Sequence, residues 1–448
     1  MRMHRSMVAA LGGVLAAAMA WSAAPAPPVL IVWAGTLLAV PGEPPLTQRS
    51  LIVRNGLIER VVPGFIGASD IVAPHGTVTT LDLSKRFVLP GLIDLHVHLT
   101  TEPSASSGLD EVTGSDADLA LIAAVNARKT LAAGFTTVMD MGTGRLAHET
   151  AIYAVRNAVE AGRIPGPQVL ACGSPISAPG SSRTQRFQPA VERTIAPQGT
   201  CSGADDCRRA VREQVRRGAD FINFYDTGSL LTPNSPAQTF TDEEMRAIVE
   251  TAHALHRKAI ADGGNNPRSA AGVNAAIRAG ADAVDTVTYP DPETWTLLAK
   301  SGVKFVPHLY ALQAAVGDTP ETLSQGSMGW LPEPILASLY ELKQQTPSAA
   351  EALRRGVPMA FASDAGVFEH GRNAGEFAQY VRLGMTPADA IKTATINAAQ
   401  VFGLTSDRAT LEAGKRADFI AVAGDPLHDI TELTRVLVVV RGGEVYQQ

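Results

Sequence analysis

Two histidines at alternate positions, His96 and His98, have the residue type and spacing that can bind a metal ion. They stand at the end of residues 87–99, FVLPGLIDLHVHL, an apolar stretch that Pro90-Gly91 interrupts. Alternate side chains on a β-strand point to the same face, so the two imidazoles project together. Such a pair can hold one metal ion. The plainer alternative is a pair of half-buried structural histidines.

Several stretches resemble the amidohydrolase superfamily of metal-dependent (β/α)₈ hydrolases. The segment PGLIDLHVHL resembles the first-strand signature of that superfamily, and its other markers follow in the usual order. They are GFTTVMDMG (134–142), FASDAG (361–366), HGRNAGE (370–376), TINAAQVFGL (395–404) and LEAGKRADFIAV (411–422). The similarity is greatest to the imidazolonepropionase-like and Xaa-Pro dipeptidase-like branch.

The elements that must position the histidines follow an α/β pattern. Strand-like and helix-like segments alternate through the middle of the chain, which is typical of a parallel barrel. The expected strands lie near 92–98, 135–140, 167–172, 220–225, 258–262, 282–287, 303–308 and 358–363. Helices are expected over 116–134, 241–258 and 267–280, and Thr241 with Glu244 forms a capping box. The sequence therefore predicts a (β/α)₈ TIM barrel over residues 89–407.

Both ends of the chain contain short β-like runs. Residues 27–88 include Asn55-Gly56, a strong hairpin signal, and residues 408–448 include the turn Gly442-Gly443. We expect one small β-sandwich domain built from these two segments, an arrangement that the resemblance also implies. With 448 residues, the chain is long enough for a barrel and such a domain.

The N-terminus has the order of a secretory signal peptide. Arg2, His4 and Arg5 precede the apolar run 7–21, and small residues follow it. We expect residues 1–26 to be removed and the mature protein to be periplasmic or secreted; an uncleaved membrane anchor is the alternative. Export implies an oxidising compartment, in which Cys201 and Cys207 could form a disulfide.

The resemblance implies metal ligands at the carboxyl ends of the barrel strands. The binuclear members use HxH on strand one, a carboxylated Lys on strand four, one His each on strands five and six, and Asp on strand eight. His96, His98 and Asp364 match this set. By the resemblance, Asp364 binds metal and takes a proton from the attacking water. An Asp in this place could also be a simple turn former, but the HxH pair and the order of the motifs favour the functional role.

Three positions depart from the pattern of the family. Asn223 stands where strand four has Lys, Asp262 where strand five has His, and Thr286 where strand six has His. Asparagine cannot form a carbamate, so we expect no binuclear centre. One divalent ion, expected to be zinc, would be held by His96, His98, Asp262 and Asp364, because Asp is an accepted zinc ligand.

A few polar residues near the expected strand ends are candidates for catalysis or substrate binding. His308, after strand seven, is a candidate proton donor or substitute ligand, although a buried structural role is an equal alternative. Tyr225 ends strand four and is expected to face the pocket. His370 and Arg372 follow strand eight and could meet a substrate carboxylate, since Arg offers a bidentate fork; they could also be surface residues.

The sequence thus predicts an exported amidohydrolase that cleaves an amide C–N bond, in a dipeptide or a non-peptide, through metal-activated water. Two alternatives stay open: a catalytically inactive barrel that acts as a binding module, and an altered, metal-free chemistry. The expected partner is a small-molecule amide, and a homo-oligomer is allowed. The net charge of −6 and the pI near 6.0 argue against nucleic-acid binding. Loops 174–203 and 309–335 are the expected lids.

Overall fold

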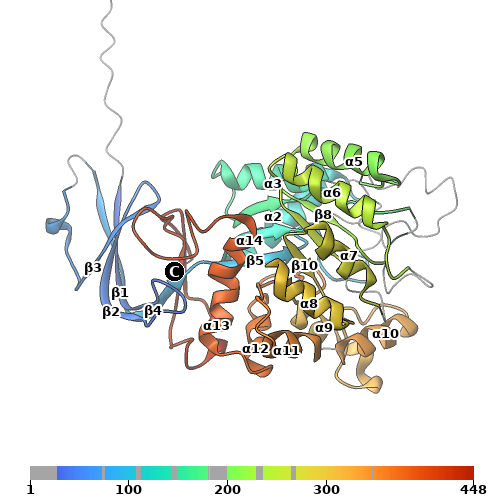
Figure 1. Cartoon of the computed structure of the whole chain (residues 1–448). Helices are drawn as coiled ribbons and strands as arrows, with labels where there is room; N and C mark the ends of the chain where they lie inside the picture. Colours follow the sequence, from blue (N-terminus) through green and yellow to red (C-terminus); the bar gives the residue numbers. More distant parts are fainter. Residues whose placement is uncertain are drawn as a thin grey trace, which may run out of the picture.

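The computed structural model describes residues 28–72, 76–106, 113–142, 149–179, 181, 199–228, 236–263, 269–344 and 347–447. A seven-stranded sheet lies at one side of the molecule, and helices gather around parallel strands on the other side (Figure 1). The expected signal peptide and most of the expected lid 174–203 lie outside the described residues. Among the described helices, none has both the length and the apolarity needed to cross a membrane.

Both ends of the chain contribute to the seven-stranded sheet, as the β-like runs predict. Its order is β14-β13-β12-β4-β1-β2-β3. The two expected turns form hairpins in the left-handed region: Asn55 and Gly56 have φ of 54° and 75°, and Gly442 and Gly443 have φ of 56° and 78°. The strands are β1 (Val29–Leu37), β2 (Leu46–Arg54), β3 (Leu57–Pro63), β4 (Val78–Pro90), β12 (Phe419–Val422), β13 (Val438–Arg441) and β14 (Glu444–Gln447).

Seven parallel strands form two further sheets, at seven of the eight places that the sequence predicts. The first sheet has the order β5-β6-β7 and the second β11-β10-β9-β8, and all of their ladders are parallel. The ladders are not continuous from one sheet to the other, so the described strands do not close into one ring. The strands are β5 (Leu92–Val97), β6 (Phe135–Asp140), β7 (Gln168–Ala171), β8 (Ile222–Phe224), β9 (Ala259–Asp262), β10 (Ala283–Asp285) and β11 (Lys304–Val306).

The expected eighth strand, residues 358–363, is not a regular strand. Its backbone nevertheless bonds to both neighbours: Ala360 N donates to Phe305 O (3.0 Å), and Leu95 N donates to Phe361 O (3.0 Å). A full ladder does not form because Pro358 has no N–H and the N–H of Ser363 is bound by a side chain. On the other side, Ile176 forms an isolated parallel bridge with Phe224 of β8.

Helices follow most of the parallel strands and cover them on the outside (Figure 1). The capping box of Thr241 and Glu244 forms at the start of α6, as predicted. The helices are α2 (Asp116–Ala132), α3 (Glu149–Glu160), α5 (Ala204–Arg217), α6 (Asp242–Ala254), α7 (Ala271–Ala279), α8 (Pro292–Ser301), α9 (Leu309–Ala315), α10 (Glu333–Lys343), α11 (Pro347–Arg354), α12 (Gly375–Arg382), α13 (Pro387–Lys392) and α14 (Ala398–Phe402). Shorter helical turns are η1 (Ala68–Asp70), η2 (Pro320–Gln325), η3 (Thr393–Asn397) and η4 (Ile430–Thr434).

The three cysteines fall into a pair and a single thiol. Cys201 and Cys207 are joined by a disulfide at the start of α5, with their Cα atoms 4.9 Å apart. Cys172 is buried immediately after β7 and is not part of a disulfide. The disulfide closes the loop that the Cys spacing suggested.

The joint between the seven-stranded sheet and β5 sets where the histidines lie. β4 ends at Pro90, and β5 starts two residues later, so Gly91 alone links them. Gly91 N donates to Asp418 O (2.9 Å), and the next residue pairs with β6. A Cβ on Gly91 would lie 2.2 Å from Oγ1 of the buried Thr136. The absence of a side chain therefore lets the chain pass directly from one sheet to the other.

Replacing Gly91 should test how tightly this joint is packed. In Gly91→Ala the new methyl group collides with Thr136, a short side chain with nowhere to move, so the free energy of unfolding should fall by about 1–3 kcal/mol. Urea denaturation measures it. Gly67→Ala is the control, because a Cβ there meets nothing closer than 3.6 Å and should leave stability nearly unchanged. Equal stability of the two variants would contradict the close packing.

Candidate active site

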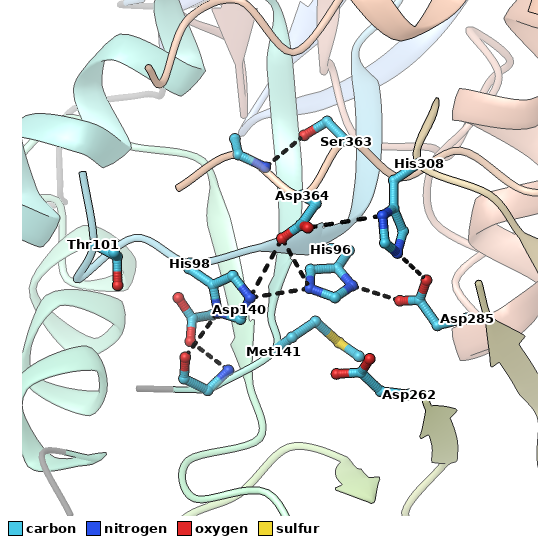
Figure 2. A network of polar contacts seen from close by, with 12 residues as sticks. His96, His98, Thr101, Asp140, Met141, Asp262, Asp285, His308, Ser363 and Asp364 are labelled. Atoms are coloured by element: carbon cyan, nitrogen blue, oxygen red, sulfur yellow. Dashed lines mark hydrogen bonds and ion pairs between the residues drawn. The ribbon is translucent and has the colours of Figure 1, made fainter. Parts of the chain in front are cut away.

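His96 and His98 project from the carboxyl end of β5 toward Asp364, as the HxH spacing predicts (Figure 2). Asp364 N donates to His96 O (2.9 Å), which holds the two segments side by side. The two Nε2 atoms of the histidines are 3.1 Å apart, and Asp364 Oδ1 lies 3.4 Å and 3.5 Å from them. Three potential ligand atoms thus converge on one point.

The Nδ1 atom of each imidazole already has a hydrogen-bond partner. His96 Nδ1 contacts Asp285 Oδ2 at 2.5 Å, and His98 Nδ1 contacts Gly142 O at 2.9 Å. Both partners are acceptors, so both Nδ1 atoms carry hydrogen, and the Nε2 lone pairs face each other. Facing lone pairs repel unless a proton or a cation lies between them. The separations are near the ~3.3 Å expected between ligand atoms about 2.0 Å from a tetrahedral ion, so these residues fit a metal.

Asp285 bridges two buried imidazoles. Its Oδ2 contacts His96 Nδ1, and its Oδ1 contacts His308 Nε2 at 2.6 Å. Burial alone would lower the pKa of both histidines, but the carboxylates of Asp285 and Asp364 together outweigh it and raise the pKa of His96 to about 10 and that of His308 to about 9. The two imidazolium rings likewise outweigh burial at Asp285 and hold its pKa well below the usual range.

A buried carboxylate, Asp94, fixes the two ligand segments relative to each other. Its Oδ1 accepts from His96 N (3.1 Å) and from Ser363 N (3.0 Å), next to Asp364. Its Oδ2 accepts from Ser363 Oγ (2.5 Å) and from Asn373 Nδ2 (2.8 Å). Burial raises the pKa of Asp94 to about 6 despite these four donors. This side chain therefore sets the distance between His96 and Asp364.

The three substituted positions line the other side of the site. Asn223 Nδ2 donates to Met141 O (3.0 Å) and to Asp262 Oδ2 (3.2 Å). Asp262 pairs in register with Asp285, so its buried side chain points inward. It lies outside the group of His96, His98 and Asp364 that could hold one ion. Thr286 Oγ1 contacts His308 Nε2 at 2.5 Å, so the His308 imidazole lies beside the position where the family has its strand-six His.

Two residues of the site have backbones in the left-handed region. Thr286 has φ of 55° and Asp364 has φ of 59°. Such a conformation is uncommon outside glycine and is unusual for a β-branched residue. Backbone strain of this kind gathers at functional sites, where the surrounding structure has to hold it.

The other predicted residues lie in different places: His308 is part of the site, whereas His370 supports it from behind and Arg372 is at the surface. His308 Nδ1 lies 3.7 Å from Asp364 Oδ2, so His308 belongs to the site. Tyr225 is buried at the end of β8. His370 is buried against Thr130 and the carbonyls of His98 and Thr101, and burial lowers its pKa to about 4. Its position supports the turn after His98. Arg372 is exposed and pairs with Glu369.

Comparison with known proteins identifies the family. The sequence profile described as "Amidohydrolase family" matches residues 87–446. The chain belongs to the amidohydrolase family. The match starts just before β5 and covers the site described above, so the expected resemblance is confirmed.

Two relatives cover nearly the whole chain. Ochratoxinase of Aspergillus niger is 29% identical over 94% of this chain and 87% of its own length. Its crystal structure, aligned at 25% identity over 94% of this chain and 96% of that one, has a TM-score of 0.77. The crystal structure of a Xaa-Pro dipeptidase with bound methionine in its active site is 28% identical over 94% of this chain and all of that one, with a TM-score of 0.82.

Sequence reasoning missed three carboxylates of this site. The bridging role of Asp285 and the support by Asp94 were not expected, although Asp94 stands inside the HxH segment and Asp285 directly precedes Thr286. Asp226, which follows Tyr225, is 1% exposed and buried near Asp262. The strand pattern held a signal for Asp285. Side chains alternate between the two faces of a strand, and Asp285 stands two residues before the end of an apolar run, on the face that points toward the site.

Replacing Asp285 should test whether its charge sets the protonation of the two histidines. In Asp285→Asn, the neutral amide no longer opposes the effect of burial, so the pKa values of His96 and His308 should both fall from about 10 and about 9. NMR titration of histidine-labelled, chelator-treated protein measures them.

Asp282→Asn is the matched control. Asp282 also contacts a histidine, His253, at 2.8 Å, but near the surface, so this change should leave the pKa values of His96 and His308 unaltered. Unchanged pKa values in Asp285→Asn would contradict the bridging role.

Proposed function

We propose that this chain is a hydrolase that cleaves an amide C–N bond of a small molecule with the help of one divalent metal ion, zinc in our assignment. His96, His98 and Asp364 would hold the ion. The observation that carries the proposal is the pair of imidazole Nε2 atoms 3.1 Å apart, both freed for a cation by the Nδ1 contacts to Asp285 and Gly142. When bound, such an ion acidifies water and polarises a carbonyl oxygen.

Asp364 is the proposed general base. Its side chain is 16% exposed, whereas that of His96 is 4% exposed, so an incoming water molecule can reach its carboxylate. Asp364 would take the proton of the water that attacks the amide carbonyl carbon. The contacts of Asp94 with His96 N and Ser363 N would keep the base in place while it does so.

His308 is the proposed donor of a proton to the leaving nitrogen. The Asp285 carboxylate keeps its imidazole protonated, and its Nδ1 faces Asp364 Oδ2 at 3.7 Å. The proton that Asp364 receives can therefore return to His308 after His308 has protonated the amine. Base and acid would be neighbours, as general acid–base catalysis requires.

The proposed substrates are dipeptides that end in proline, N-acyl amino acids or aromatic amides, as the resemblance to the family implies. The name of the similar Xaa-Pro dipeptidase supports the first of these classes. Tyr225, His370 and Arg372 stay candidates for substrate contact. We also propose that the two parallel sheets and residues 358–363 form one (β/α)₈ barrel, supported by the isolated bridges Ile176–Phe224, Phe305–Met359 and Val97–Ala365.

Export is a further part of the proposal. The charged, apolar and small-residue order of residues 1–26 supports a periplasmic or secreted location. The Cys201–Cys207 disulfide supports it independently, because disulfides persist in oxidising compartments.

Metal content and hydrolysis test the proposal together. The zinc-supplemented chain should hold about one zinc at the imidazole pair and hydrolyse at least one substrate of a panel of N-acyl amino acids, aromatic amides and Xaa-Pro dipeptides. Asp364→Asn should lower kcat by about 10²–10⁴-fold, the usual contribution of a general base. His96→Ala/His98→Ala should lose both the zinc and the activity.

The matched control removes two other histidines. His253→Ala/His256→Ala changes one residue in the last turn of α6 and one just after it, away from the site, so zinc content and activity should be retained. If the unaltered chain binds no more zinc than His96→Ala/His98→Ala, the hydrolase proposal fails. The chain is then an inactive amidohydrolase-fold binding module.

A further inference from the structure

The carboxyl group of Glu376 is buried beside the segment that carries His308. Its Oε1 accepts from Leu309 N (3.0 Å) and its Oε2 accepts from Tyr310 N (2.6 Å), so it binds the two residues that follow His308. Glu376 is completely buried. Burial raises its pKa to about 8, although the two N–H groups and the nearby charge of His308 favour the ionised form. Both oxygen atoms therefore hold the backbone at the start of α9.

A second side chain of α12 binds the residue that precedes His308. The hydroxyl of Tyr380, one helical turn after Glu376, donates to Pro307 O at 3.0 Å. Tyr380 is also completely buried, and its hydroxyl lies close to the Glu376 carboxyl group. Residues four apart lie on the same face of an α-helix. One face of α12 thus binds the backbone immediately before and immediately after His308.

The ring of Tyr310 packs directly on the start of α12. A Cβ on Gly375 would lie 2.7 Å from this ring, so the absence of a side chain there allows the close approach. The ring centre lies 4.9 Å from that of Phe368, and the guanidinium of Arg372 lies 5.7 Å from it. Tyr310 is consequently fixed by its side chain as well as by its N–H.

A buried lysine holds the other end of α9. Lys343 is 6% exposed, and its ammonium group donates to Val316 O and Gly317 O at 3.2 Å each and contacts Asp318 at 2.8 Å. A carboxyl group at the amino end and an ammonium group at the carboxyl end match the dipole of the helix. A shift of α9 along its axis would break the contacts at both ends.

The stretch that contains Glu376 also supports the other half of the site. Asn373, three residues earlier, donates to Asp94 Oδ2 at 2.8 Å, and Asp94 accepts from His96 N at 3.1 Å. Two nearby side chains of one short stretch thus connect the segment of His96 with the segment of His308.

We propose that Glu376 and Tyr380 are positioning residues for His308, the proton donor of the proposed function, on which this inference rests. They keep its imidazole within reach of two carboxylates: Nε2 lies 2.6 Å from Asp285 Oδ1, and Nδ1 lies 3.7 Å from Asp364 Oδ2. Both distances depend on where the backbone of residues 307–310 lies. A displacement of about 1 Å in such a group can lower a rate about 100-fold.

A comparison of leaving groups tests this role in the zinc-supplemented full chain. Glu376→Gln keeps the shape of the side chain, but its amide turns an N–H group against one of the two backbone N–H groups. For the N-acyl amino acid or Xaa-Pro dipeptide that the chain hydrolyses fastest, kcat should fall by about 10–100-fold with KM unchanged. The ester analogue, with oxygen in place of the leaving nitrogen, should be cleaved nearly as fast as by the unaltered chain, because an alkoxide needs a proton far less than an amide nitrogen does. Tyr380→Phe should act in the same direction.

A double-mutant cycle separates positioning from general damage. His308→Gln should show the same preferential loss for the amide, and adding Glu376→Gln to it should lower kcat little further, because Glu376 acts through His308. The matched control is Gln379→Ala, which changes a buried side chain of α12 that bonds to Arg382 instead. It should leave the hydrolysis of both substrates unaltered.

Two NMR measurements on the chelator-treated chain need no activity. Exchange of the amide hydrogens of Leu309 and Tyr310 should be about tenfold faster in Glu376→Gln, since a hydrogen bond of about 1 kcal/mol is lost. The resonance of the ring proton between His308 Nε2 and Asp285 should shift in Glu376→Gln and in Tyr380→Phe, and stay in place in Gln379→Ala.

Three results would each overturn the proposal: equal losses of kcat for the amide and the ester, additive losses in the cycle, or unchanged amide exchange together with an unchanged His308 resonance. If the unaltered chain hydrolyses neither substrate, the proposed hydrolase fails. The two NMR measurements then still decide whether α12 sets the position of His308.

Discussion

The hydrogen bonds of His96 Nδ1 and His98 Nδ1 determine how the other groups of this site can be arranged. Because Asp285 and Gly142 O take the Nδ1 hydrogens of His96 and His98, the Nε2 atoms must face each other across 3.1 Å. That arrangement is stable only with a positive charge between the rings. In the metal-free chain a proton meets this need, since His96 has a pKa of about 10; a divalent ion would meet it in the loaded chain.

The fold supplies this constraint by bringing distant segments together. Gly91 lets β4 of the seven-stranded sheet continue directly into β5, which carries both histidines. Asp94, on the same strand, then binds the backbone on both sides of the site, at His96 and at Ser363. Asp285 comes from the other parallel sheet and joins His96 to His308.

Much of this could be predicted from the sequence because it depends on local patterns. The HxH alternation, the Asn55-Gly56 hairpin, the capping box at Thr241 and seven of the parallel strands follow from residue type and spacing. Residues 358–363 were expected to be a strand like the others. There Pro358 lacks an N–H and the side chain of Asp94 accepts the N–H of Ser363, which no hydrophobic pattern reveals. The bridging by Asp285 and the burial of Asp226 depend on which strands neighbour each other, and a single sequence carries no such pairing. Whether Asp262 points inward also depended on register, and the pairing with Asp285 answers it.

The central claim is that His96, His98 and Asp364 bind one metal ion through two imidazole Nε2 atoms and a carboxylate. X-ray diffraction of zinc-soaked crystals at the zinc absorption edge tests it most directly, because the anomalous signal locates the ion itself. The account predicts one strong anomalous peak about 2.0–2.2 Å from both Nε2 atoms and from Asp364. No peak between the two imidazoles, with His96 Nε2 still in contact with His98 Nε2, would contradict it.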